Sequence, residues 1–141
     1  MEGVLKYWDS TLMEPKIVAF EPWKITVDTT NHTNDRNNST NRQYAKLFTA
    51  MALVIPKNGY ILYADNNPDW PGGDHQHHYY DFYKTNLGKP NGTMVEVRDG
   101  LAYKKFENGF AAYNRTASSQ SFDVDETNYT LGSLEGLLQS N

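Results

Sequence analysis

The chain has 141 residues, a net charge of −4 and 38% hydrophobic side chains, which fits one ordinary domain or two small ones with a modest core. This acidic balance provides no basic surface for nucleic acid, and no apolar run approaches the roughly 18 residues of a membrane span. The lack of cysteine excludes a disulfide framework and a thiolate zinc site.

The amino terminus shows no signal peptide, because Met1–Val4 provides neither a basic region nor the start of an apolar stretch. Six Asn-x-Ser/Thr triplets are present, but a chain rich in Asn and Thr produces them by chance, so we do not expect glycans on them. They begin at Asn31, Asn37, Asn38, Asn91, Asn114 and Asn128. We expect a soluble protein whose compartment is undetermined; an extracellular parent protein remains open.

The first half of the chain has the pattern of a βαβ unit. Residues 17–23 form a short apolar run that is typical of a buried strand, and a polar loop covers 26–41. Apolar side chains at helical spacing predict a helix over Tyr44–Ile55, with Thr40 and Gln43 at capping-box spacing. Residues 60–65 then predict a second strand. Strands in this order normally pair in parallel through a right-handed crossover.

The second half has a different character. A helix is expected from Asp74 to about Leu87, with Gly88 after its end. The pair Asp99-Gly100 predicts a hairpin between Met94–Arg98 and Leu101–Phe106. Further strands are expected over residues 110–113, 121–124 and within 129–138. We therefore expect a partial βαβα segment over residues 1–90 and an antiparallel β domain over residues 91–141.

Two parallel strands alone would leave open edges, because parallel sheets are normally buried between neighbours. One solution is that further strands belong upstream, in the same polypeptide or in another. The other solution is that the hairpins complete the sheet, which gives a freestanding α+β domain. The pattern of the sequence allows both.

Several segments resemble the last part of glycoside hydrolases that carry a (β/α)₈ barrel and a C-terminal β-sandwich. The helix Tyr44–Ile55 and the run Asn58–Asp65 look like the last inter-strand helix and the eighth barrel strand. The segment Asp81–Pro90 is similar to the region that closes the barrel. Asp99–Gly109 and Phe110–Asn114 resemble the opening strands of the sandwich, the latter ending in Asn.

The resemblance covers about Ile17 to Leu138 and implies an α/β fold followed by all-β: the last two βα units of a barrel plus a small antiparallel sheet. It implies carbohydrate as the substrate and no cofactor. The upstream strands that would hold most catalytic groups are missing from the 141 residues. We therefore expect the chain to be a C-terminal part that is not active alone, partnered by an upstream barrel half.

Two carboxylates follow the predicted strands and are candidates for catalysis. Glu21 lies at the carboxyl end of the first strand, which is the catalytic face of a barrel. The resemblance places Glu21 after the seventh strand, where many barrel hydrolases carry the nucleophile, and Asp65 ends the next strand. Glycoside hydrolysis needs two such groups. A solvated strand-end carboxylate at Glu21 and an Asx turn at Asp65 are the structural alternatives.

Aromatic and imidazole side chains near these carboxylates are candidates for substrate binding. They are Trp23, Tyr63, Trp70, His75 and His78. Trp23 suits stacking on a sugar face, but it also suits packing over the strand end.

Three other functions remain open. The first is a carbohydrate-binding module that uses Trp23, Trp70, Tyr79 and Tyr80 without cleavage. The second is a small metal protein that uses His75, His77 and His78, since imidazole binds transition metals. A purely structural domain is the third.

Overall fold

The computed structural model describes residues 1–14, 16–20, 37–57, 60–63 and 79–141. Within these ranges the chain has an α+β fold with two α-helices, one parallel strand pair and six antiparallel strands in two sheets. The elements are α1 (Glu2–Thr11), β1 (Ile17–Phe20), α3 (Ser39–Val54), β2 (Tyr60–Tyr63), the 3₁₀ helix η1 (Asp81–Lys84), β3 (Val95–Arg98), β4 (Leu101–Phe106), β5 (Gly109–Asn114), β6 (Gln120–Val124), β7 (Thr127–Leu131) and β8 (Glu135–Ser140).

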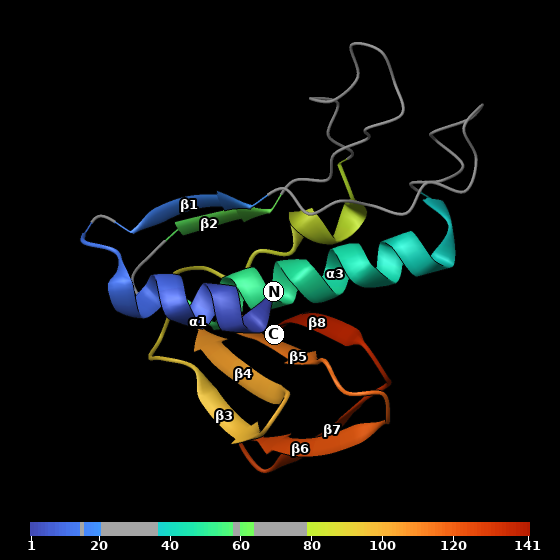
Figure 1. Ribbon diagram of the computed structural model, residues 1–141. Coiled ribbons are helices and arrows are strands. Elements are labelled where there is room, and N and C mark those ends of the chain that lie inside the picture. The colour runs from blue at the N-terminus through green and yellow to red at the C-terminus, as the bar shows by residue number, and fades with distance from the viewer. Residues whose placement is uncertain (15, 21–36, 58–59, 64–78) are drawn as a thin grey trace, which may run out of the picture.

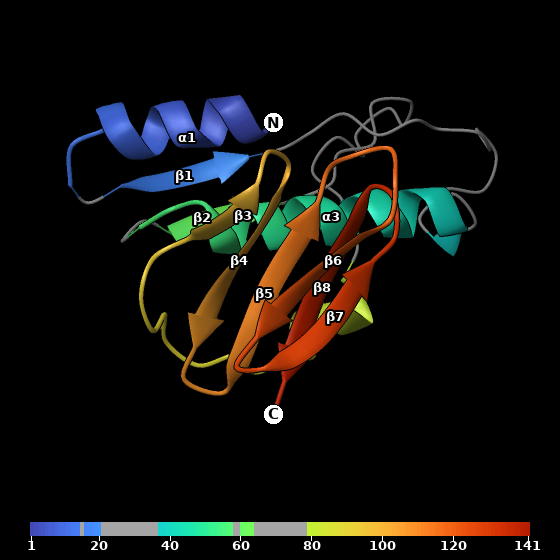
Figure 2. The ribbon, with the colours of Figure 1, turned by 90° about the horizontal axis from the view of Figure 1, so that it is seen from below.

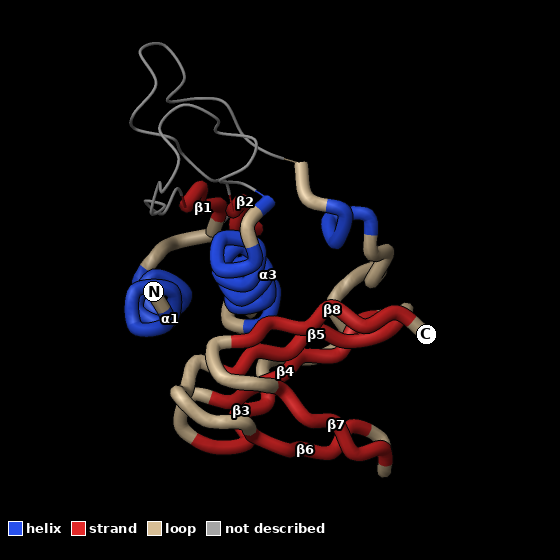
Figure 3. Tube along the Cα trace, turned by 90° about the vertical axis from the view of Figure 1, so that its right-hand side faces the viewer, coloured by secondary structure: helices blue, strands red, loops and turns tan. Residues whose placement is uncertain are grey.

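The elements stack in layers (Figures 1 and 3). The parallel pair β1–β2 lies on one side of α1 and α3, and the four-stranded sheet lies on the other side of α3. The hairpin β6–β7 covers the far face of that sheet, as the view from below shows (Figure 2). The four-stranded sheet has the order β3-β4-β5-β8. The helix α3 is therefore held between a parallel and an antiparallel sheet.

The parallel pairing expected for the first half is confirmed. Ile17 pairs with Tyr60 and Phe20 with Tyr63, so β1 and β2 run side by side without a shift in register. Helix α3 connects them, as the βαβ pattern predicts. Helix α1, which precedes β1, was not expected, and it extends the order to helix, strand, helix, strand.

Helix α3 forms where the apolar spacing predicts it, but it begins differently. The N-cap is Asn38, whose side chain accepts a hydrogen bond from the Asn41 amide at 2.9 Å. The predicted cap at Thr40 is wrong, because Thr40 lies inside the first turn. Asn is at least as good an N-cap as Thr, since its side-chain oxygen satisfies an unpaired amide of the first turn.

The helix predicted from Asp74 to Leu87 is wrong over its described part. Residues 79–87 contain only the short 3₁₀ helix η1, and Thr85, which follows it, has an extended backbone. Of the four residues that suggested a helical face, Tyr79, Phe82 and Tyr83 form a local aromatic cluster with Tyr80, whose ring stacks on Phe82 with centroids 5.2 Å apart. The fourth, Leu87, packs into the hydrophobic core. Tyr83 contacts Tyr79 and Tyr80, which precede it by four and three residues. Residues on one face of a helix have the same separations.

The hairpins of the second half are confirmed. Asp99-Gly100 joins β3 to β4, and Gly100 has a φ of 80°, which a glycine adopts without strain. Side chains along β4 and β5 point alternately into two hydrophobic cores. Ala102, Phe106 and Tyr113 pack toward the helices, and Leu101 and Phe110 pack toward the β6–β7 hairpin.

A single buried side-chain amide, that of Asn114, fixes the corner after β5. Asn114 is fully buried and donates to the carbonyls of Ser118 at 2.8 Å and Gly132 at 2.7 Å. Its side-chain oxygen accepts from the Thr116 amide at 2.9 Å and from the Thr116 hydroxyl at 2.7 Å. These bonds tie the turn after β5 to the end of β7, which gives a physical reason for a strand that ends in Asn.

Helix α3 and β8 approach each other closely at Gly136. A Cβ at this position would lie 2.4 Å from the Lys46 carbonyl oxygen and 2.7 Å from the Leu47 Cα. No other residue type fits such a contact without moving the helix or the strand. The buried Lys104 on β4 adds a second link, because its Nζ donates to the carbonyls of Pro56 at 2.5 Å and Leu53 at 3.3 Å at the end of α3.

The first prediction concerns this contact. Gly136→Ala is expected to lower the free energy of unfolding by about 1–3 kcal/mol, because the methyl group overlaps the backbone of α3. Urea unfolding followed by circular dichroism measures the change. Gly3→Ala is the matched control, since nothing lies within 4 Å of its added Cβ; it should leave stability unchanged or raise it by up to about 1 kcal/mol. Equal effects of the two substitutions would contradict the account.

The second prediction concerns the corner amide. Asn114→Ala is expected to lower the free energy of unfolding by about 3 kcal/mol, because it leaves several buried polar groups without a hydrogen bond. The control Asn128→Ala removes an exposed side chain that bonds only to Asp123 among the described residues, and it should stay within about 0.5 kcal/mol of wild type. A neutral Asn114→Ala in the same urea titration would show that the corner does not depend on this side chain.

Candidate functional site

The predicted catalytic groups are expected to lie at one edge of the parallel pair, the carboxyl edge. Because Phe20 pairs with Tyr63, β1 and β2 end at the same edge. Tyr63 is the last residue of β2, so its backbone lies at that edge as expected. The other predicted site residues lie outside the residues that the structure describes: Glu21, Trp23, Asp65, Trp70, His75, His77 and His78.

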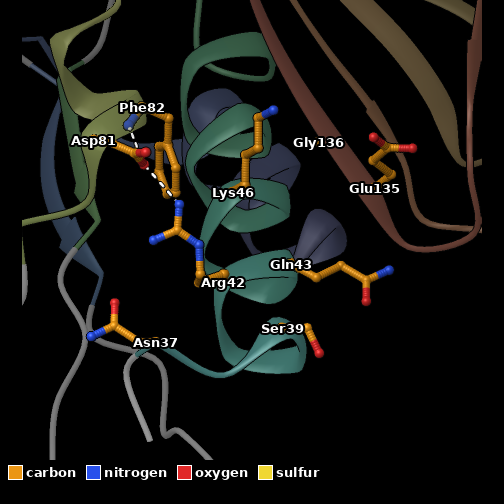
Figure 4. A pocket seen from close by; sticks show the side chains of 9 residues that line it. All are labelled: Asn37, Ser39, Arg42, Gln43, Lys46, Asp81, Phe82, Glu135 and Gly136. Carbon is orange, nitrogen blue, oxygen red and sulfur yellow. Dashed lines mark hydrogen bonds and ion pairs between the residues drawn. The ribbon is translucent and has the colours of Figure 1, made fainter. Parts of the chain in front are cut away.

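A hollow among the described residues lies elsewhere, over the N-terminal half of α3 (Figure 4). It is an open pocket of about 690 Å³ bounded by η1 on one side and the start of β8 on the other. Seven of its nine described lining residues have polar or charged side chains. The described residues that line it are Asn37, Ser39, Arg42, Gln43, Lys46, Asp81, Phe82, Glu135 and Gly136.

An ion pair fixes one wall of this pocket, which we call the α3 pocket. Arg42 donates to an oxygen of the Asp81 carboxylate at 2.9 Å, and the Phe82 amide donates to the same oxygen at 3.0 Å. The Arg42 guanidinium also lies 5.9 Å from the centre of the Tyr80 ring. The hydrogen bond from Arg42 lowers the pKa of Asp81 below its ordinary value. Asp81 therefore stays ionised at neutral pH and offers an acceptor rather than a proton.

The turn between β7 and β8 forms the opposite wall. Gln43 donates to the Ser133 carbonyl at 2.8 Å, and the Gly132 amide donates to the Glu135 carboxylate at 2.5 Å. Leu134 has a φ of 52°, a conformation that costs a residue with a Cβ about 1–2 kcal/mol. Its amide bonds to the Thr116 carbonyl at 3.1 Å. The surrounding bonds hold this strained turn in one shape.

The aromatic residues of η1 divide into buried and exposed rings. Tyr80 is only 1% exposed and stacks on Phe82 with an interplanar angle of 6°. A ring so deeply buried does not offer a face to sugar, so the proposed use of Tyr80 for stacking is wrong. Tyr79 is 64% exposed and lies edge-on to Tyr83 at 5.6 Å.

A second group of charges anchors α1 to the antiparallel sheet. The buried Glu2 carboxylate accepts hydrogen bonds from the Tyr113 hydroxyl at 3.0 Å and from Arg115, and it pairs with Lys6 at 2.9 Å. Burial by itself would raise the pKa of Glu2, but the bonds from Lys6, Arg115 and Tyr113 together hold that pKa below its ordinary value. Burial, and then the Glu2 charge, raises the pKa of Tyr113. The cluster holds a structural carboxylate, not a proton donor.

No motif or local pattern in the sequence predicts the α3 pocket. Its lining comes from three segments that are far apart along the chain. Only the spacing of Arg42 and Lys46, four residues apart on the polar face of α3, indicates that two cations project together. Within the described residues, no group of His, Asp and Glu is arranged to hold a metal ion, and the histidines of the metal hypothesis lie outside them.

No protein-family model and no curated protein matches this chain. Among the described helices, none has the length and apolar character needed to cross a membrane. The assignment of a function therefore depends on the geometry of the two sites.

The third prediction follows from the pKa of Glu2. A carboxyl group whose folded pKa lies below its ordinary value of 4.5 stabilises the fold above that pH, and the contribution is lost as pH falls through the folded pKa. Glu2→Gln should therefore cost more stability at pH 7 than at an acidic pH below the folded pKa of Glu2, where the native carboxyl group is also neutral. Urea titrations at both pH values measure this difference. An equal cost at both would contradict the role of the charge; Glu126→Gln is the exposed control.

Proposed function

We propose that this chain forms the C-terminal part of a glycoside-hydrolase-like protein, as the last two βα units of a (β/α)₈ barrel followed by an antiparallel β unit. This proposal rests on the arrangement of helices and strands in the first half of the chain. The order α1-β1-α3-β2 alternates helix and strand, and β1 and β2 are parallel and in register. Both helices lie on the side of the pair that faces the antiparallel sheet (Figures 1 and 3). Helices on one face only are typical of a barrel wall, because a doubly wound sheet carries helices on both faces.

The open edges of the parallel pair are an argument for a partner that would add neighbouring strands. Among the described residues, β1 and β2 pair only with each other. Parallel strands normally have neighbours and are buried on both faces. The upstream half of a barrel, in the same polypeptide or in another, would supply these neighbours.

The proposed chemistry is hydrolysis of a glycosidic bond. Glu21 follows the last residue of β1 by one position, and Asp65 follows the last residue of β2 by two. The carboxyl edge of barrel strands carries the catalytic groups. In this proposal, Glu21 is the nucleophile or the acid/base group, and Asp65 supports it. One carboxyl group protonates the leaving oxygen while the other attacks the anomeric carbon or activates water. Tyr63, Trp23, Trp70, His75 and His78 are the proposed sugar contacts.

The fourth prediction tests this chemistry in the polypeptide encoded by the complete reading frame that contains the chain. Hydrolysis is measured with a panel of aryl glycosides of glucose, xylose, mannose and galactose. Glu21→Gln should lower kcat by about 10²–10⁴-fold, because it removes a group that transfers protons or attacks the sugar. The exposed carboxylate of Glu126 provides the control, and Glu126→Gln should leave kcat unchanged. Hydrolysis that persists undiminished in Glu21→Gln would refute the assignment.

A further inference from the structure

We propose that the α3 pocket is a second carbohydrate site, which binds a neutral glycan without cleaving it. None of its lining residues belongs to the proposed catalytic edge of β1 and β2. The proposal therefore goes beyond the hydrolytic function and does not depend on Glu21.

The charges of the pocket favour a neutral ligand. Two cationic side chains, Arg42 and Lys46, face two carboxylates, Asp81 and Glu135, so the formal charges cancel. A phosphate or a sulfate would meet repulsion from the carboxylates, and a cation would meet repulsion from Arg42 and Lys46. A ligand that carries many hydroxyl groups meets neither penalty.

The hydrogen-bonding groups match hydroxyls in particular. A sugar hydroxyl both donates and accepts, so it is best bound where donors and acceptors alternate. Arg42 and Lys46 donate, the carboxylate oxygens of Asp81 and Glu135 accept, and the Gln43 amide does both. These groups come from three elements that surround one open volume (Figure 4). No single apolar wall dominates the lining.

One aromatic ring supplies the apolar contact that a sugar face needs. Phe82 is half-buried and lines the pocket. Its ring is held in place by stacking on Tyr80 at 5.2 Å and by edge contact with Tyr83 at 4.9 Å. A ring fixed before binding loses little conformational freedom when a ligand arrives, which favours affinity.

The polar walls are also fixed before a ligand binds. Arg42 is held by Asp81, Gln43 is held by the Ser133 carbonyl, and the Gly132 amide orients Glu135. The strained Leu134 in the same turn fits a general pattern, because strained residues gather at binding sites. The volume of about 690 Å³ lies within the range of roughly 300–1,000 Å³ that is usual for small-molecule sites.

Cleavage at this pocket is not supported, because hydrolysis needs a carboxyl group that donates a proton. The Arg42 hydrogen bond keeps the pKa of Asp81 low. The carboxylate of Glu135 is engaged by the backbone of its own turn. We therefore assign this site to glycan binding without cleavage.

The test measures glycan binding to the 141-residue chain itself by isothermal titration calorimetry, with cellohexaose, laminarihexaose, xylohexaose and mannohexaose as probes. At least one probe should bind. Phe82→Ala should weaken its binding about tenfold, because the stacking ring is lost. Lys46→Ala should weaken it severalfold without touching the aromatic cluster, so it decides the question even if Phe82→Ala fails to fold. Tyr7→Ala is the matched control, since Tyr7 on α1 is an exposed ring that does not line the pocket.

Two results would overturn the proposal. One is the absence of binding for all four probes at millimolar concentration. The other is binding that is lost in Tyr7→Ala but kept in folded Lys46→Ala. The outcome is distinguishable from that of the hydrolytic proposal, because binding to this pocket should be unchanged in Glu21→Gln, whereas hydrolysis should not survive that substitution.

Discussion

The rest of the structure depends on the contact between β8 and α3 at Gly136. A strand and a helix come so close there that the Lys46 carbonyl occupies the space of a side chain. Leu47, Ala50 and other apolar residues of α3 then reach into one core with residues of β4 and β5. That core crosses the expected boundary at residue 90, so the antiparallel unit is packed directly against α3 rather than joined to it by a linker.

Helix α3 therefore has three roles in this structure. It is the crossover between β1 and β2, and so it determines that both strands end at the same edge. Its polar face supplies Arg42, Gln43 and Lys46 to the α3 pocket. Its last turn is capped by the buried Lys104, whose pKa is lowered by burial. The antiparallel sheet thus fixes the helix on which the proposed catalytic edge and the proposed glycan site both depend.

Local sequence signals predicted the elements that local physics determines. Helical spacing predicted α3, and Asp99-Gly100 predicted the β3–β4 hairpin, because turns and apolar faces are encoded by near neighbours. Helix α1 was missed because Leu5 is its one buried apolar side chain and its other anchor, Glu2, is bound by the distant Tyr113 and Arg115. The α3 pocket was missed for the same reason: its walls meet only after folding. The predicted site residues after β1 and β2 remain predictions.

The central claim is that α3 and the antiparallel sheet unfold as one unit. Native-state hydrogen exchange of individual amides measures this directly, since amides of one cooperative unit exchange with the same opening free energy. The opening free energies of amides in the middle of α3, such as Leu47 and Met51, should match those of Ala111 and Tyr113 in β5 within about 1 kcal/mol. Exchange of the α3 amides at a much lower free energy, with β5 still protected, would show that the helix opens on its own and would contradict the claim.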